Sequence, residues 1–441
     1  MLGVGYVHRV LDWQIREMRK HLSVLFFCLF LVMIGFGITL PVFPFYAERL
    51  ARGGGVSQGA AAVHVGLLTG LYALMQFLFA PLWGRWSDRV GRKPLVLIGI
   101  AGYAIAQAMF GLAHSLRLFY GARIIGGILS SAMFPAVTAY VADVTTEDER
   151  SRGMAWEGTA VSLGVVFGPA LGGLLARSDL QLRMGSCHLT IPAFSVPFFA
   201  AALLALLTLP VVIRWLPESL ASGSASTPEK QSANGWRHLG IQLWPLLALA
   251  LAAQFGLAMF EATFALHARE MLGYGPAGVG AVFMVCGAVM AVFQGGAVGY
   301  LAPRVSAGHQ VAVGFVLMGI DLAVLLFTRS TPLVLTIVGL QALGMALITP
   351  NLTALVSKGQ KQQTGAALGL RNAANSLGQA AGPGLGGLLF AFNMRAAYSI
   401  TGALLVAIGI ICASVMQRGN MGRSDGQIWG RKSSGHDPPL K

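Results

Sequence analysis

Long apolar runs alternate with short polar segments along almost the whole chain of 441 residues. A helix needs about 20 apolar residues to cross the hydrocarbon core of a bilayer, and about twelve runs reach or approach that length. They cover residues 22–46, 62–84, 95–114, 117–142, 153–176, 192–213, 243–267, 277–300, 309–328, 332–356, 364–391 and 396–417. Because only helices satisfy every backbone hydrogen bond within one such run, the pattern predicts an all-α membrane protein.

The polar segments divide the chain into parts. Residues 214–242 are serine-rich and predict a flexible linker between an N-terminal six-helix bundle (22–213) and a C-terminal one (243–417). Residues 418–441 are rich in glycine and serine and predict a disordered tail. We expect residues 1–21 to be either an extension of little function before a natural start at Met18 or a weakly amphipathic surface helix. The apolar run that follows lacks a small-residue cleavage site, so it predicts a first span rather than a removable signal peptide.

The positions of the positive charges predict the orientation. Most of the 31 Lys and Arg residues fall in the N-terminal segment, the linker, the tail and every second loop, so they lie on one side of the membrane. Cytoplasmic loops carry an excess of Lys and Arg. We therefore expect a multi-pass protein of the cell membrane with both termini in the cytoplasm.

Composition excludes several function classes. With 55% hydrophobic and 11% charged residues, the chain is too apolar for an ordinary soluble protein. The net charge of +14 does not indicate nucleic-acid binding, because no basic stretch is interleaved with aromatic residues. The four cysteines have no metal-ligand or disulfide spacing. Since no phosphate-binding loop is present either, we expect no enzyme activity, no cofactor and no metal.

An internal repeat supports the division into two similar halves. The stretch 162–175 matches 376–389, with Ser, Leu-Gly, Gly-Pro, Leu-Gly-Gly and Leu-Leu recurring in order. Pro135-x-x-Thr138-Ala139 is repeated as Pro350-x-x-Thr353-Ala354, and Gly84 has a degenerate counterpart at Gly299. Such repeats generate two pseudo-symmetric bundles with the substrate site at their interface.

A dense cluster of charge separates the second and third spans. It contains Gly84, Asp88, Arg89, Gly91 and Arg92 in the pattern Gly-x-x-x-Asp-Arg-x-Gly-Arg-Lys. This pattern between two spans resembles the loop signature of the major facilitator superfamily. The resemblance implies the twelve-helix fold of that family, alternating access, and a usually monomeric transporter of small molecules.

In that family the loop forms a conformational switch with an acid at the end of the fourth span. The resemblance therefore implies that Asp88 and Arg89 act with Asp143, and that Asp88 meets the N-terminus of the eleventh span, where a helix dipole favours an anion.

Two glycine-rich patterns resemble twelve-span drug:proton antiporters. The first is Gly35-x-Gly37-x-x-x-Pro41-x-x-Pro44, which we interpret as either a flexible gate on the outer side or an irregular helix end. The second, in the fifth span, contains Gly164, Gly168, Pro169, Gly172 and Gly173. Small residues at this spacing let helices approach closely, which would by itself explain the glycines. The whole pattern is similar to the antiporter signature and favours export.

A few ionisable residues lie inside apolar runs, where charge is costly and usually functional. Arg123, followed by Gly127, resembles the fourth-helix motif implicated in proton coupling; snorkelling to the outer surface is the alternative. Asp321 is the first candidate for the proton site, Glu261 the second, and Glu157 lies close enough to an end to reach water. A structural pair, such as Arg371 with an acid, is the other interpretation of each.

Polar and aromatic residues within spans predict a mostly apolar substrate cavity with a few polar groups. Interhelical hydrogen bonding would explain any single one of the amides equally well. The candidates are Tyr72, Gln76, Gln254, Phe260, Phe264, Gln341, Asn372, Asn375 and Gln379.

The stretch 71–77 before the charged loop is similar to tetracycline/proton antiporters and their multidrug relatives. Departures from these exporters concern acids: Leu31-Val32-Met33 stands where they have an acid in the first helix, the third span has none, and Asp321 is shifted by nearly one turn. We therefore expect a proton-coupled exporter of lipophilic or cationic compounds without a named substrate. A proton-coupled transporter of a small metabolite, and a membrane sensor on a transporter scaffold, remain as alternatives.

Overall fold

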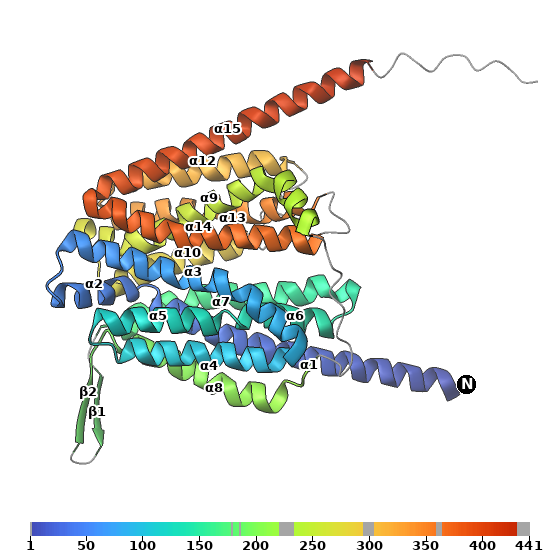
Figure 1. Ribbon diagram of the computed structural model, residues 1–441, viewed down its shortest axis with the longest axis horizontal. Coiled ribbons are helices and arrows are strands. Elements are labelled where there is room, and N and C mark those ends of the chain that lie inside the picture. Colours follow the sequence, from blue (N-terminus) through green and yellow to red (C-terminus); the bar gives the residue numbers. More distant parts are fainter. Residues whose placement is uncertain are drawn as a thin grey trace, which may run out of the picture.

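The computed structural model describes residues 2–177, 180–184, 187–219, 233–293, 304–358 and 364–429. Long helices form two bundles that lie side by side (Figure 1). The first half contains α1 (Leu2–Thr39), α2 (Phe43–Gly53), α3 (Gln58–Val90), α4 (Arg92–Gly111), α5 (Leu116–Ser130), α6 (Met133–Val144), α7 (Glu147–Leu175), β1 (Leu180–Met184), β2 (Cys187–Ile191) and α8 (Val196–Trp215). The second half contains α9 (Ala233–Leu272), α10 (Pro276–Val292), α12 (Ala307–Leu325), α13 (Thr331–Ser357), α14 (Thr364–Phe392) and α15 (Met394–Trp429).

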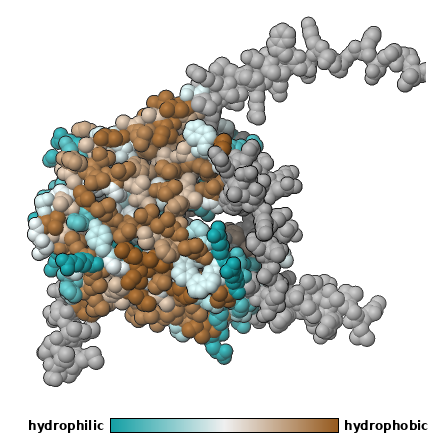
Figure 2. All heavy atoms as spheres, in the orientation of Figure 1, coloured by the Kyte–Doolittle hydropathy of each residue, from teal (hydrophilic) through white to brown (hydrophobic). Residues whose placement is uncertain are grey.

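The helices have the length and surface of membrane spans. Within the described residues, ten helical segments are long and apolar enough to cross a bilayer, with α5 and α6 counting as one. The apolar helix α10 and the more polar α14 complete the expected set. Hydrophobic residues cover most of the face of both bundles that Figure 2 shows, and many large hydrophobic side chains are exposed on the helices. An apolar face turned outward over whole helices is stable in lipid and not in water. The predicted all-α membrane fold is therefore confirmed.

Prolines interrupt two of the predicted spans. The first run does not continue to residue 46: α1 ends at Thr39, and a turn containing Pro41 leads into the separate helix α2. The fourth run is divided between α5 and α6 by a turn at Ser131, just before Pro135. Proline lacks the N–H that would continue the ladder of helical hydrogen bonds, so each break falls within a few residues of one.

Three polar segments also differ from expectation. The loop containing Cys187 forms an antiparallel hairpin, in which Leu180 pairs with Ile191 and Met184 with Cys187. Helix α15 continues to Trp429, so the first part of the expected disordered tail is helical; an existing helix extends without a new nucleation step. Helix α9 begins at Ala233, within the expected linker. Linker residues 220–232, the counterpart of the charged loop at 299–303 and tail residues 430–441 lie outside the described residues.

The two ends of the bundles are packed differently. We call them the hairpin end, which carries α2 and β1–β2, and the termini end, toward which both chain ends point (Figure 1). At the hairpin end one hydrophobic core unites both halves, with Phe119 and Phe198 from the first and Phe264 and Phe283 from the second. At the termini end the cores are separate, and Figure 2 shows the surface hollowed between the halves.

Glycines allow the backbones to touch within and between the halves. A Cβ on Gly168 of α7 would lie 2.6 Å from the Cα of Gly37 on α1, in the same half. A Cβ on Gly173 would lie 2.7 Å from the Cα of Ala277 on α10, and one on Gly387 of α14 would lie 2.7 Å from the carbonyl oxygen of Ala62 on α3, both across the halves. We call these cross-half contacts the glycine seal. All of them lie toward the hairpin end.

We predict that Gly168→Ala lowers the thermal stability of the purified protein, because the added methyl group must separate α7 from α1. Overpacking of this kind costs about 1–3 kcal/mol. Gly158→Ala is the matched control: it lies on the same helix and has no atom within 4 Å of the added Cβ. Equal unfolding temperatures for the two variants would contradict the close α1–α7 contact.

Candidate functional site

A cavity of about 370 Å³ lies between the two halves. Its first-half wall comes from α1, α3, α4, α5, α6 and α7, together with the start of α2. The second half contributes Ala258, Glu261 and Ala262 of α9 and Gln379 and Pro383 of α14. A volume of about 300–1,000 Å³ with a mostly apolar lining is typical of drug-sized ligand sites.

The cavity wall of the first half contains one arginine. The guanidinium of Arg123 on α5 lies over the ring of Phe43, with its central carbon 3.8 Å from the ring centroid, and 5.1 Å from that of Tyr72. Phe43 reaches this position because the turn at Pro41 redirects the chain into α2. Cation–π contacts stabilise a guanidinium in a low-dielectric site. Arg123 thus faces the cavity, and the structure gives no support to snorkelling.

The opposite wall contains one carboxylate. Glu261 is the only acidic residue among those that line this cavity in the described part of the chain. Its neighbours in the wall, Ala258 and Ala262, are apolar. One cationic and one anionic side chain therefore face the same cavity from different halves.

The predicted cavity residues divide into two groups. Tyr72, Gln76 and Gln379 line the cavity. The others do not: Phe260 and Phe264 lie in the hydrophobic core, and Gln341 is buried in α13. Gln254, Asn372 and Asn375 are also absent from the lining. Helical periodicity predicts that Asn372, Asn375 and Gln379 share one face of α14, but of these three only Gln379 lines the cavity.

The other predicted acids do not line the cavity either. Asp321 on α12 is buried inside the second half, and its Oδ2 has no hydrogen-bond partner among the described residues. Glu157 on α7 accepts a hydrogen bond from the Thr138 hydroxyl at 2.9 Å. Arg371 donates to the carbonyl oxygen of Thr349 at 3.1 Å rather than pairing with an acid.

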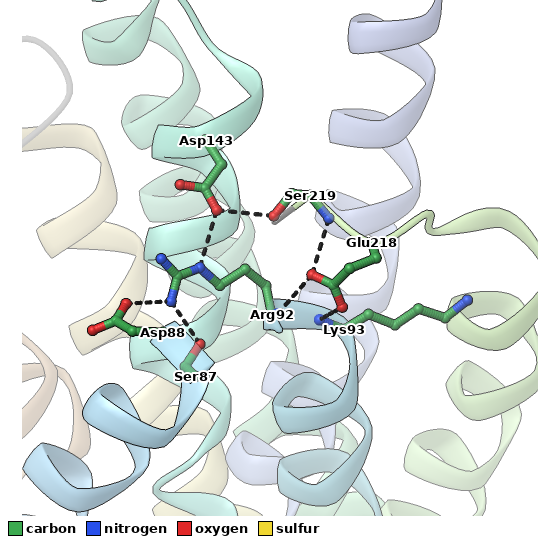
Figure 3. A network of polar contacts seen from close by, with 7 residues as sticks. All are labelled: Ser87, Asp88, Arg92, Lys93, Asp143, Glu218 and Ser219. Atoms are coloured by element: carbon green, nitrogen blue, oxygen red, sulfur yellow. Dashed lines mark hydrogen bonds and ion pairs between the residues drawn. The ribbon is translucent and has the colours of Figure 1, made fainter. Parts of the chain in front are cut away.

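A network of polar contacts, which we call the latch network, joins α3, α4, α6 and the segment after α8 (Figure 3). Arg92 is its centre. Its Nε donates to Asp143 at 3.0 Å, and its Nη1 donates to Asp88 at 2.6 Å and to Ser87 at 3.0 Å. The Arg92 side chain is only 9% exposed, so these charge-assisted bonds lie in a partly desolvated site.

Glu218 completes the latch network (Figure 3). Its carboxylate accepts the backbone N–H groups of Arg92 and Lys93 at 2.7 and 3.2 Å, at the N-terminus of α4. Backbone donors and the helix dipole both favour an anion there. Gly91 permits this contact, since its φ of 108° suits glycine and a Cβ would collide with the Glu218 carboxylate.

The sequence analysis placed Asp88, Arg89 and Arg92 in the switch loop and expected Asp88 and Arg89 to act with Asp143. Asp88 and Asp143 take part, as expected, but Arg92 rather than Arg89 joins them. Arg89, near the end of α3, is exposed and has no partner in the described part of the structure, whereas Arg92, which follows the break at Gly91, is buried. The Asp88 side chain is 60% exposed. Gly84 has open space around it.

The antiporter-like glycines of α7 contact two neighbours. Gly164, Gly168 and Gly172 face α1, with their added Cβ atoms directed at Met33, Gly37 and Ile38. Gly173 and the carbonyl oxygen of Pro169 face Ala277 and Gly280 of α10 in the other half. The repeat in α14 contacts α9 and α3 in the same manner.

Sequence reasoning missed a set of ion pairs at the hairpin end. Arg269 of α9 donates to the buried Glu48 of α2 at 2.6 Å, and Gln58 of α3 donates to Glu270 of α9. Arg52 lies 3.6 Å from the same Glu48 carboxylate. The Arg269 and Gln58 contacts connect the halves beside the glycine seal, whereas the Arg52 contact lies within α2. Arg269 and Glu48 are too far apart in sequence for spacing to predict that they pair. The only local indication was the presence of an acid, Glu48, between Pro44 and the next span.

Known proteins resemble the chain over nearly its full length. The family model of the Major Facilitator Superfamily matches residues 25–360 and 298–428. Multidrug resistance protein 2 of Bacillus subtilis is 28% identical over 404 residues, which are 90% of this chain and 95% of that protein. Quinolone resistance protein NorA of Staphylococcus aureus is 25% identical over 408 residues, or 90% of this chain and 96% of that protein.

Solved structures share the fold. The human organic anion transporter MFSD10 superposes with a TM-score of 0.65 at 25% identity, covering 90% of this chain and 99% of that one. A POT family transporter in complex with a thioalcohol-conjugated peptide gives a TM-score of 0.72 at 15% identity, covering 90% and 96%.

We predict that Arg92→Ala destabilises the purified protein, whereas Arg89→Ala leaves its unfolding temperature nearly unchanged. Removing the buried guanidinium breaks two ion pairs and costs about 1–3 kcal/mol. The matched arginine three residues earlier makes no such contact. A thermal unfolding measurement in detergent compares the two, and a larger effect of Arg89→Ala would contradict the observed network.

Proposed function

Since the chain belongs to the major facilitator superfamily, and is thus a multi-pass membrane transporter of small molecules, we propose that it exports lipophilic cations in exchange for protons. The relatives named for multidrug and quinolone resistance support export of drug-like compounds. The glycine pattern of α7, with its contacts to both α1 and α10, supports the antiporter assignment.

One observation carries the proposal: Glu261 is the single acidic residue of the cavity lining described here. An unpaired negative charge is costly in an apolar wall. The Glu261 carboxylate would therefore either be protonated or pair with a bound cation. A lipophilic cation that binds beside Glu261 displaces its proton, and a proton displaces the cation. This competition is what antiport requires.

Glu261 replaces Asp321 as the preferred proton site. Both acids lie within apolar helices, but only Glu261 lines the cavity. A substrate in the cavity can therefore contact Glu261 directly, whereas Asp321 would have to act through the packing of α12. Arg123 would influence Glu261 through its positive charge across the cavity.

The two ends would open alternately. In this structure the halves are joined at the hairpin end by the glycine seal and the Glu48–Arg269 pair, and separate at the termini end. The excess of Lys and Arg supports a cytoplasmic termini end, and with that orientation this arrangement would be inward-facing. Rocking of the halves would break the contacts at the hairpin end and bring exposed Asp88 to the N-terminus of α14, where a helix dipole favours it.

The alternative of a metabolite transporter has less support than the sequence suggested. It relied on the amides of α14, and only Gln379 among them lines the cavity. The largely apolar lining suits a lipophilic substrate better.

We predict that purified protein releases protons when a lipophilic cation such as tetraphenylphosphonium is added, and that Glu261→Gln abolishes the release. The amide keeps the shape of the side chain and removes the exchangeable proton. Asp321→Asn is the matched control and should retain release, which a pH-indicator dye in weakly buffered detergent solution measures. Release that persists in Glu261→Gln and disappears in Asp321→Asn would reverse the assignment.

We further predict that Arg269→Ala favours opening of the hairpin end, because Glu48 loses its shorter ion pair across the halves. A change of roughly tenfold in the open population corresponds to about 1.4 kcal/mol, within the range for a charged hydrogen bond. Spin labels at Gly53→Cys and Gly275→Cys, which have no atoms within 4 Å of the added Cβ, report the separation after native cysteines are replaced.

The control for this measurement is Arg117→Ala, which removes an exposed arginine of α5 at the same end. The distance distribution should lengthen in Arg269→Ala and stay unchanged in Arg117→Ala. Identical distributions would show that the ion pair does not hold the halves together.

A further inference from the structure

Arg123 is a cavity cation without an anionic partner. Arg52, Arg92 and Arg269 form ion pairs elsewhere in the structure, and Arg123 forms none with the described residues. Its Nε is buried and makes no hydrogen bond in that part of the structure. The aromatic rings stabilise its charge but do not neutralise it.

The geometry of Arg123 leaves its donors free. Phe43 covers one face of the guanidinium, with the central carbon 3.8 Å from the ring centroid, and the ring centroids of Tyr72 and Phe110 lie 5.1 and 5.5 Å from that carbon. The donors of a guanidinium lie in its plane, so stacking on one face leaves the edges able to bind a carboxylate with two parallel hydrogen bonds. The hydroxyl of Tyr103, which lines the same cavity, is another buried donor for which the described residues provide no partner.

We propose that Arg123 forms a carboxylate-binding subsite, so that the transporter accepts zwitterionic amphiphiles as well as simple cations. This inference rests on the proposed function, since the amine of such a substrate would bind at Glu261. Arg123 belongs to the first half and Glu261 to the second, and both line one cavity. A molecule with an aromatic core, one carboxylate and one cationic group matches this arrangement of charges and the apolar wall between them.

The subsite is tested with a fluorescent pair that differs in one group. A rhodamine acid carries a carboxylate and a cationic xanthene, and its methyl ester carries only the cation. Fluorescence polarisation gives their dissociation constants for purified protein in detergent, without a proton gradient, so a role of Arg123 in proton coupling does not affect the readout.

We expect Arg123→Gln to weaken binding of the acid roughly ten- to a hundredfold and binding of the ester less than about threefold, as loss of a charge-assisted hydrogen-bond pair implies. Tyr103→Phe removes only a hydroxyl and should weaken the acid alone by a few-fold. Tyr103→Phe serves as an independent variant if Arg123→Gln does not fold. Equal weakening of acid and ester, or no weakening of either, would overturn the subsite.

Failure of the proposed function gives a different result. Glu261→Gln should weaken binding of both dyes, because both carry the cation. If Glu261→Gln leaves the ester unaffected while Arg123→Gln still weakens the acid, the carboxylate subsite stands and the cation site at Glu261 is wrong.

Discussion

Direct backbone contact between the two halves at the hairpin end is the constraint on which the rest of the structure depends. Gly173 lies against Ala277, and Gly387 lies against Ala62, at distances that no Cβ would permit. Each half is itself packed as a unit through contacts such as Gly168 with Gly37, and in this arrangement the halves meet at the hairpin end and separate at the termini end. The cavity and its access from the termini end follow from this closure.

The cavity combines an apolar wall with two opposite charges that come from different halves. Arg123 is held by aromatic rings, and Glu261 is flanked by alanines. Neither Arg123 nor Glu261 has an oppositely charged partner in its own half among the described residues. A ligand group of opposite charge would therefore bind favourably beside either side chain. The same electrostatic deficit would underlie both the proton exchange proposed at Glu261 and the carboxylate subsite proposed at Arg123.

The latch network shows which contacts a sequence pattern can predict and which it cannot. The pattern from Gly84 to Arg92 identified the correct segment and the participation of Asp88 and Asp143. It did not identify Arg92 as the centre, because the choice between two nearby arginines depends on which one the fold buries. It also missed Glu218, which lies 126 residues from Arg92 and meets the start of α4 only because α8 returns to the same end.

The sequence by itself determined the membrane class and the family's fold, and it predicted two similar halves and the segments expected to carry function, since the length of an apolar run, a repeat and a loop signature are all readable without the fold. Only the tertiary structure decided which polar residues meet: it brought Glu261 and Arg123 to one cavity, left Asp321 inside the second half, and paired Glu48 with Arg269. Hydropathy reports that a residue is buried. Whether it faces a neighbouring helix or a cavity depends on the rotation and kinks of each helix, which packing between distant segments fixes.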